Sequence, residues 1–223
     1  MQVIMETIFD VAYLVAVITL GAIMCLRSRG NRGFRLFGVM AVVLGCGDAF
    51  HLVPRVYSLV TGTMSENFAA LGFGTLVTSV TMTVFYVMFY RFMQLRYKLV
   101  GNKPLTLAVY ALAAARIALC LLPQNDWLSA DAPWSWGVYR NIPFVILGVL
   151  LICLVFAEAR KHKDKPFRLA WLAIALSFAF YIPVVLFADA APIIGMLMLP
   201  KTICYVWLVL MGFGEFRRSI RAG

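Results

Sequence analysis

Residues 11–47 read VAYLVAVITLGAIMCL, then RSRGNRGFR, then LFGVMAVVLGCG. Two long apolar runs are therefore separated by a short connection that carries four arginines. A helix needs about 20 mostly apolar residues to cross the hydrocarbon core of a membrane. Because charged residues between such runs stay in water, this stretch predicts two transmembrane helices joined by a basic loop.

The same pattern continues along the whole chain, which has 223 residues, is 63% hydrophobic and has a mean hydropathy of +0.89. This composition is too apolar for a soluble domain and predicts an all-α, polytopic integral membrane protein. Continuously apolar runs favour helices over the alternating strands of a membrane barrel. We expect a single seven-helix transmembrane domain over residues 1–223, with helices at about 4–26, 37–56, 68–89, 105–122, 138–157, 169–188 and 193–213.

The distribution of charge predicts the orientation of this bundle. Sixteen of the 20 lysines and arginines lie in four clusters, at 27–35, 91–103, 160–168 and 217–221, which fall on one side of a seven-helix chain. By the positive-inside rule that side is cytoplasmic, so we expect the N-terminus outside, the C-terminus in the cytoplasm and a multi-pass protein of the cell membrane. The net charge of +10 then reflects topology, and the sequence predicts no nucleic-acid partner.

The N-terminus does not predict a cleaved signal peptide, and the cysteines do not predict disulfides or a metal site. Residues 1–10 lack a basic segment and carry two acidic residues, so we expect the first helix to be retained rather than cleaved as a signal peptide. The five cysteines are scattered over five segments without a CxxC pair. They predict neither a disulfide framework nor a thiolate metal site, and we expect no metal and no cofactor.

Several ionisable residues fall inside the apolar segments, where an unpaired charge is costly. At 1.5 Å per residue, Asp48, Arg116 and Lys201 each lie about 20 Å from the basic boundary of a core about 30 Å thick. Three helices thus place a charge at one level, with Tyr13 and Tyr181 near it. We therefore expect a polar pocket in the extracytoplasmic half of the bundle.

The second segment contains the most informative local motif, GCGDAFHLVPR at residues 45–55. Asp48, His51 and Arg55 share one helical face. An acid beside an imidazole can orient it and raise its basicity, and Ser79 on the third segment lies at the level of Asp48. Asp48, His51 and Ser79 are therefore candidate catalytic residues. In the structural alternative, Asp48 pairs with Arg116 or Lys201 and the hydroxyl of Ser79 bonds its own backbone.

The remaining polar residues of this half are candidates for substrate binding. Arg140 begins the fifth segment, where it could hold a phosphate or a carboxylate at the depth of the lipid headgroups, or extend into solvent. Lys201 could bind an anion, pair with Asp48 or form a Schiff base. The candidate substrate-binding residues are Arg116, Arg140, Lys201, Tyr181, Asp10 and Arg55.

Two classes of function fit these residues. The first is a membrane-embedded enzyme, a hydrolase or acyl transferase, that acts on a lipid or lipid-like substrate; membrane lipid would then be its partner. The alternative is a transporter or permease for a small solute, which would use a buried pair of Asp48 with Arg116 or Lys201. Pro183 and Pro200, inside the last two segments, fit alternating access.

Two resemblances to known families bear on these hypotheses. The Asp48-x-x-His51 spacing and the seven segments resemble the alkaline ceramidases, which are seven-helix zinc hydrolases. That family needs further histidines on the last helix, whereas the other histidine of this chain, His162, lies in a basic connection, so a zinc site of that kind is not predicted. Lys201 on the last segment resembles the retinal-binding lysine of microbial rhodopsins, but the third segment lacks the usual acidic counterion. A sensor or photoreceptor is the remote alternative.

Overall fold

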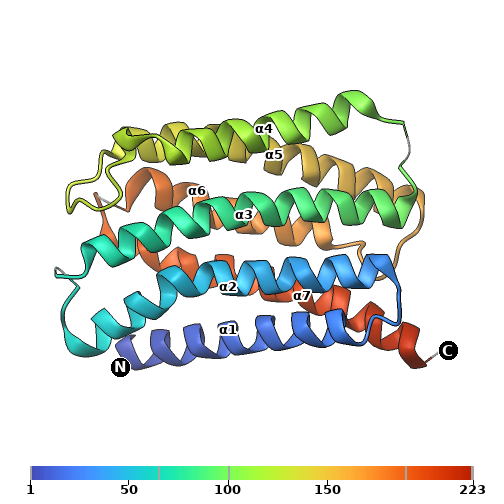
Figure 1. The fold of residues 1–223 in the computed structure, drawn as a ribbon, viewed down its shortest axis with the longest axis horizontal. Coiled ribbons are helices and arrows are strands. Elements are labelled where there is room, and N and C mark those ends of the chain that lie inside the picture. The colour runs from blue at the N-terminus through green and yellow to red at the C-terminus, as the bar shows by residue number, and fades with distance from the viewer. Residues whose placement is uncertain (1, 65, 100, 189, 222–223) are drawn as a thin grey trace.

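The computed structural model describes residues 2–64, 66–99, 101–188 and 190–221, which form seven α-helices and two short 3₁₀ helices (Figure 1). Each α-helix is long and apolar enough to span a membrane, as the sequence predicts. The α-helices are α1 (Gln2–Leu26), α2 (Arg32–Thr61), α3 (Phe68–Tyr97), α4 (Lys103–Leu121), α5 (Trp134–Lys161), α6 (Ala170–Phe187) and α7 (Met198–Arg221); the 3₁₀ helices are η1 (Pro123–Asn125) and η2 (Pro192–Leu197).

The helices pack in sequence order, each against the next, and contacts between α1 and α7 close the ring. Helix α3 also contacts α5, and α2 contacts α7. Small residues allow the closest approach between α1 and α2. A Cβ atom on Gly38 would lie 2.7 Å from the carbonyl oxygen of Gly21, so no larger side chain fits between the two backbones.

The two ends of the bundle differ in charge. The basic clusters at 27–35, 91–103, 160–168 and 217–221 all lie at the end where α1 finishes and α7 finishes, on the right in Figure 1. We call it the basic end, and the other the N-terminal end because α1 begins there. The sequence predicts that these clusters lie together, and the alternating direction of the helices places them so.

Local capping explains where several helices begin and end. The side chain of Asn31 accepts hydrogen bonds from the backbone nitrogens of Gly33 and Phe34, which starts α2. Gly62, in the left-handed conformation, ends the same helix. The helices α2, α3, α5 and α7 extend 4 to 8 residues beyond the predicted apolar segments at one or both ends, because a helix can continue past the residues that are apolar enough to lie in hydrocarbon.

Helix α7 begins later than the sequence predicted. Residues 193–197 belong to η2, and Pro200 lies in the first turn of α7 rather than at a kink inside it. Proline has no backbone N–H, and its ring clashes with the carbonyl group four residues earlier, at Met196. A regular α-helix therefore starts at Met198, and the chain just before it follows a 3₁₀ path.

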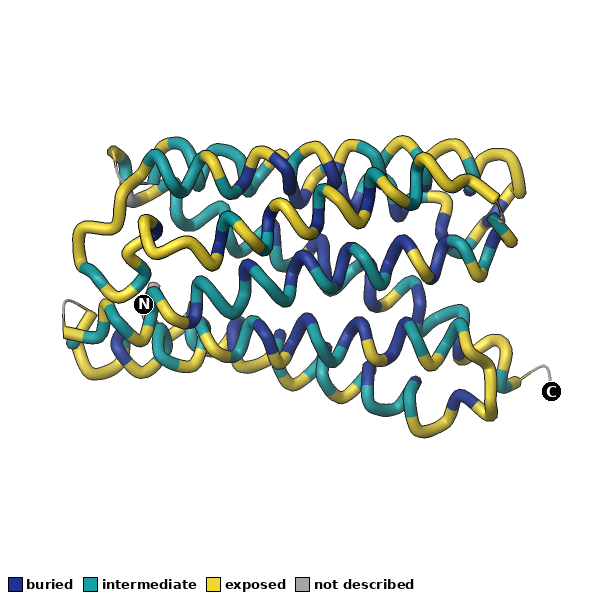
Figure 2. Tube along the Cα trace, turned by 45° about the horizontal axis from the view of Figure 1, so that its top comes forward, coloured by how far each residue is buried: buried dark blue, intermediate teal, exposed yellow. Residues whose placement is uncertain are grey.

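The core is rich in aromatic residues and fills the half of the bundle nearer the basic end. The rings of Phe37, Phe92 and Phe167 form a cluster with centroid distances of 4.8 to 5.9 Å. Figure 2 shows buried positions recurring along the inward side of the helices, with exposed positions on the outside. Nearer the middle of the bundle, the hydroxyl oxygens of Tyr86 and Tyr205 lie 3.2 Å apart. The polar half of the bundle extends from there towards the N-terminal end.

Candidate functional site

A cavity of about 80 Å³ lies among α1, α2, α3, η2 and α7, in the half of the bundle nearer the N-terminal end. We call it the charged cavity. Its lining extends from η2 and the early turns of α1 down to Tyr205, and its volume suits a few water molecules or one small polar group. Its ionisable lining residues, apart from Tyr205, are Glu6, Asp10, Asp48, His51, Arg55 and Lys201.

Asp48 is held at the inner part of this cavity by α1. The hydroxyl of Tyr13 donates a hydrogen bond of 2.5 Å to Asp48 Oδ2. Lys201 interacts electrostatically with Asp48, but no ion pair within 4.0 Å joins Asp48 to Lys201 or to Arg116 in the described part of the chain. The direct ion pair considered from the sequence is therefore wrong: Asp48 accepts a hydrogen bond from Tyr13, and Asp48 and Lys201 line the same cavity without a direct ion pair.

Lys201 is buried between two aromatic rings at the start of α7. Its Nζ atom lies 4.3 Å from the ring centroid of Tyr181 and 5.8 Å from that of Tyr205. Such cation–π contacts stabilise a charge that is removed from water. The 3₁₀ path before α7 sets this position, because the lysine lies in the first turn of the helix, directly after Pro200.

His51 is oriented by α3 and not by Asp48. Its Nδ1 atom lies 3.2 Å from the carbonyl oxygen of Leu71 and 3.1 Å from the hydroxyl oxygen of Thr75. A carbonyl oxygen only accepts, so this contact requires a proton on Nδ1, and a neutral imidazole then has its lone pair at Nε2. The approach depends on Gly74, since a Cβ atom there would lie 2.6 Å from the Cα atom of His51.

The outer part of the charged cavity contains an ion pair that closes α1 against α2. Arg55 Nη2 lies 3.3 Å from Glu6 Oε2, and the carboxylate of Glu6 is nearly buried. Asp10, one turn deeper on α1, is also buried. Asp10 and Arg55 were predicted from the sequence to belong to the pocket, whereas the contribution of Glu6 was missed. Its i, i+4 spacing from Asp10 was the available signal.

Ser79 lies outside the lining of the charged cavity. Its hydroxyl donates a 2.7 Å hydrogen bond to the carbonyl oxygen of Thr75, one turn earlier on α3. No hydrogen bond connects Ser79 with His51 or Asp48 among the described residues. The geometry therefore does not assemble the nucleophile, base and acid considered from the sequence, because the helical turn puts Ser79 on a different face from Thr78, which does line the cavity.

Arg116 lies apart from the charged cavity, although its depth matches that of Asp48. Its side chain is 2% exposed, and its guanidinium carbon lies 3.2 Å from the ring centroid of Phe144. Nε and Nη1 have no hydrogen-bond partner among the described residues. Helix α4 contacts α3 and α5, and Arg116 is not among the described residues that line the charged cavity, although it interacts electrostatically with Tyr205 and Lys201, which do line it.

A second, larger space of about 320 Å³ lies under the loop that joins α4 to α5, and we call it the vestibule. Its wall includes Arg140, whose Nη1 atom donates a 3.0 Å hydrogen bond to Asn125 Oδ1 and whose guanidinium lies 4.2 Å from the ring centroid of Trp127. Tyr181 also lines it, and Met198 lines both the vestibule and the charged cavity. The predicted pocket is thus two adjoining spaces.

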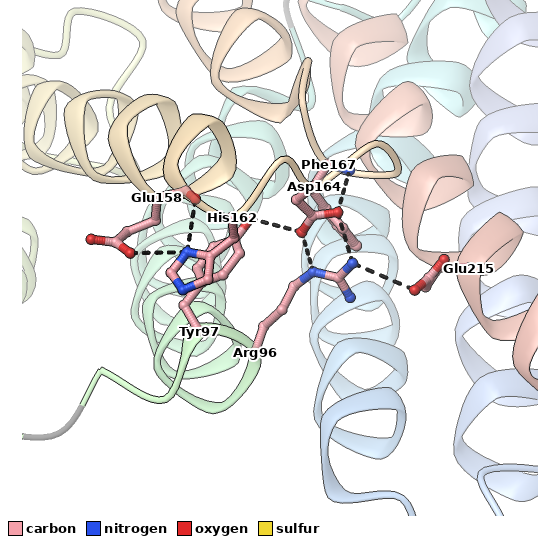
Figure 3. A network of polar contacts seen from close by, with 7 residues as sticks. All are labelled: Arg96, Tyr97, Glu158, His162, Asp164, Phe167 and Glu215. Atoms are coloured by element: carbon pink, nitrogen blue, oxygen red, sulfur yellow. Dashed lines mark hydrogen bonds and ion pairs between the residues drawn. The ribbon is translucent and has the colours of Figure 1, made fainter.

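The basic end contains a polar network that was not predicted from the sequence (Figure 3). Arg96 of α3 forms ion pairs with Asp164, in the connection between α5 and α6, and with Glu215 of α7. The hydroxyl of Tyr97 donates a 2.8 Å hydrogen bond to Asp164, and the ring of Tyr97 stacks on His162 at 5.0 Å. These contacts connect three segments that are far apart in the chain. The residues lie in or beside the basic clusters, and nothing in the sequence indicated that they contact one another.

The geometry of Asp164 affects its acidity. Burial raises the pKa of this carboxyl group, but hydrogen bonds from Arg96 and Tyr97 and the positive charge of Arg96 lower it further than burial raises it. The pKa therefore lies below its ordinary value of 3.8. We assign this network to stability because its acidic and basic groups already satisfy one another.

Neither a metal site nor a relative identifies the function. Within residues 2–64, 66–99, 101–188 and 190–221, no group of three or more His, Cys, Asp or Glu side chains is arranged to hold a metal ion. Comparison of the chain with protein-family models, curated protein sequences and solved structures returns no match. The two adjoining spaces are therefore the features of the structure that bear on function.

Proposed function

We propose that this protein is a membrane-embedded hydrolase that acts on an ester of a lipid or lipid-like substrate. The observation that carries the proposal is the convergence of Asp48, His51 and Lys201 on one cavity within the bundle. An imidazole with a fixed tautomer, a carboxylate and a cation are the groups that water activation and oxyanion stabilisation require.

In this proposal, water replaces Ser79 as the nucleophile. His51 Nε2 accepts a proton as the water oxygen attacks the ester carbonyl carbon, and Lys201 stabilises the negative charge that develops on the carbonyl oxygen. The bond from carbon to the alcohol oxygen then breaks, and the alcohol leaves with the proton from His51. The products are a carboxylic acid and an alcohol. Asp48, held by Tyr13, keeps Lys201 charged and positions the water.

The orientation belongs to the same proposal. We place the basic end in the cytoplasm and the N-terminus outside, in the cell membrane, because lysine and arginine concentrate in cytoplasmic loops. The charged cavity and the vestibule then lie in the extracytoplasmic half. A lipid of the outer leaflet would reach them without crossing the membrane. Cysteine-accessibility labelling of intact cells, with single cysteines at Ser129 and Ser219, tests this orientation.

The activity is tested with purified protein and a panel of micellar phospholipids and lysophospholipids, with mass-spectrometric detection of the released fatty acid. We expect turnover to fall about a hundredfold or more in His51→Gln, which removes the general base. We expect a similar fall in Asp48→Asn, which removes the carboxylate that keeps Lys201 charged and positions the water. His162→Gln is the matched control, since His162 lies at the basic end and is exposed. Equal activity in His51→Gln and His162→Gln would contradict the proposal.

A second candidate, solute transport, is favoured by one observation. The break between η2 and α7 lines the charged cavity, and discontinuous helices commonly form the substrate sites of transporters. In that case a solute or proton would bind between Asp48 and Lys201. Solute-dependent proton movement into proteoliposomes, lost in Asp48→Asn and accompanied by no lipid hydrolysis, would decide for transport.

A further inference from the structure

A groove of about 250 Å³ runs between α5 and α6 in the same half of the bundle as the vestibule. Its walls are apolar apart from Asn141 and Tyr181, and they include Val138, Ile142 and Ile146 of α5. From Val138 to Ile146 the groove extends about 12 Å along the helix. A straight hydrocarbon chain is the chemistry that such a wall accommodates.

The groove adjoins the vestibule directly. Asn141, Tyr181 and Val185 line both spaces. The hydroxyl of Tyr181 donates a 2.9 Å hydrogen bond to Asn141 Oδ1, which connects α6 to α5 at this boundary. An amphiphile with its chain in the groove would therefore place its polar head beside the vestibule.

The vestibule and its surroundings carry an excess of positive charge. Tyr181 interacts electrostatically with Arg116 and Arg140, and its ring lies 4.3 Å from Lys201 Nζ. The described residues that line the vestibule include Arg140 but no aspartate or glutamate. Arg140 therefore lines the vestibule without a carboxylate among the described lining residues, and Lys201 lies against the ring of Tyr181, which lines the vestibule as well. Buried positive charge of this kind favours an anion.

Arg140 is the cation best placed to contact a headgroup. One of its nitrogens is used by Asn125, and its guanidinium plane is supported by Trp127. A guanidinium group has five N–H donors, and a phosphate accepts them in pairs. Arg140 is therefore held in place while donors remain for a ligand.

We propose that the groove and the vestibule form one binding site for an anionic phospholipid, with an acyl chain between α5 and α6 and the phosphate beside Arg140. A zwitterionic headgroup fits less well, because its ammonium group would meet Arg140 and, beside Tyr181, Lys201. As an assignment of substrate class, this inference rests on the proposed function, but the binding is measurable without turnover.

The test is native mass spectrometry of the intact protein in a mild detergent, with lysophosphatidylglycerol and lysophosphatidylcholine of equal chain length added together. We expect at least a fivefold preference for the anionic lipid. Arg140→Gln should reduce this preference to near one, while Ile142→Trp, which fills the groove, should weaken binding of both lipids. Glycerol phosphate, which has the headgroup chemistry without a chain, should not be retained.

Two control variants match the changes. Arg160→Gln removes an arginine that lies 5.8 Å from a phenylalanine ring at the basic end of the same helix, and Val149→Trp enlarges an exposed residue of α5 outside the groove. Neither should alter the lipid preference. Equal retention of the two lipids by the wild-type protein, or equal effects of Arg140→Gln and Arg160→Gln, would overturn the proposal.

Failure of the proposed function would give a different result. If the chain is not a hydrolase, the anionic lipid is still retained by the wild-type protein and by His51→Gln, but no fatty acid is released by either. If the lipid site is wrong but hydrolysis is right, fatty acid is released and Arg140→Gln and Ile142→Trp behave like their controls.

Discussion

The hydroxyl of Tyr13 on α1 donates a 2.5 Å hydrogen bond to Asp48 Oδ2 on α2, between residues 35 positions apart in the chain. This bond fixes a carboxylate at the inner part of a cavity within the helical bundle. In the described part of the chain, Asp48 and Lys201 line the same space without a direct ion pair.

Removing the phenol should weaken the fold. We expect Tyr13→Phe to lower the free energy of unfolding by about 1.5–3 kcal/mol, because a buried carboxylate loses a hydrogen bond to its charged form. Denaturant unfolding in detergent measures the change. Tyr57→Phe, at an exposed position on α2, is the control and should have little effect. Equal effects of the two changes would exclude a stabilising role for the bond.

The effects on stability of replacing Asp48 and of replacing Lys201 should depend on each other. Asp48→Asn leaves Lys201 without its carboxylate, so thermal stability should fall, and adding Lys201→Met should restore part of it. Arg116→Met should change the melting temperature of wild type and of Asp48→Asn by the same amount, since the charge that acts on Asp48 is that of Lys201. A double-mutant cycle on melting temperatures tests this, and a larger gain from Arg116→Met in Asp48→Asn than in wild type would contradict the arrangement.

The buried guanidinium of Arg116 should itself limit stability. It stacks on Phe144, but two of its nitrogens have no partner among the described residues. Replacement of a poorly satisfied buried charge by an apolar side chain is often neutral or stabilising by about 1–4 kcal/mol. We expect Arg116→Met to unfold at a higher temperature and to show a weaker preference for anionic lipid. A large loss of stability would mean that a ligand or water satisfies the charge.

The network at the basic end predicts a dependence on pH. The pKa of Asp164 is lower in the folded protein than in the unfolded chain, so its contribution is fully present above the unfolded value of about 4 and is lost as the pH falls through the folded value. Asp164→Asn should lower the free energy of unfolding by roughly 3 kcal/mol at pH 7, because it breaks the partly buried ion pair between Arg96 and Asp164.

The difference in stability between wild type and Asp164→Asn should stay constant from pH 7 to about 5 and narrow below pH 4. Thermal unfolding across this range measures it. Asp131→Asn, in the exposed loop before α5, is the control and should give no such difference. A difference that grows on acidification would mean that the folded protein raises the pKa of Asp164 instead of lowering it.

Gly74 should be required for the position of His51. A Cβ atom at this residue would lie 2.6 Å from the Cα atom of His51, so Gly74→Ala must separate α3 from α2. We expect the free energy of unfolding to fall by about 1–3 kcal/mol, the usual effect of an extra atom in a closely packed contact. Turnover should also be lost. Gly214→Ala, where the added atom meets open space, should be neutral or stabilising.

Much of the fold could be predicted from local patterns, whereas the site could be predicted only in part. Depth along each helix follows from counting residues, and this count predicted Asp48 and Lys201 at one level; in the structure both residues line the charged cavity. Rotation about the helix axis does not follow from such a count. Arg116 has the same depth but faces Phe144, and Ser79 turns towards its own backbone. Depth alone therefore gave candidates for a site without separating its members from their neighbours.

The sequence by itself determined the number of helices and the end at which the basic clusters gather. Both follow from the cost of placing charge and backbone in hydrocarbon, which is a property of each segment alone. Only the tertiary structure decided that, among the described residues, Asp48 is hydrogen-bonded to Tyr13 and forms no direct ion pair with Lys201 or Arg116. It also decided that Leu71 and Thr75 orient His51. Likewise, only the structure shows that Arg96 contacts Asp164 and Glu215. These contacts depend on how the helices are rotated and how closely they approach, and small residues and side-chain packing from several segments set both together.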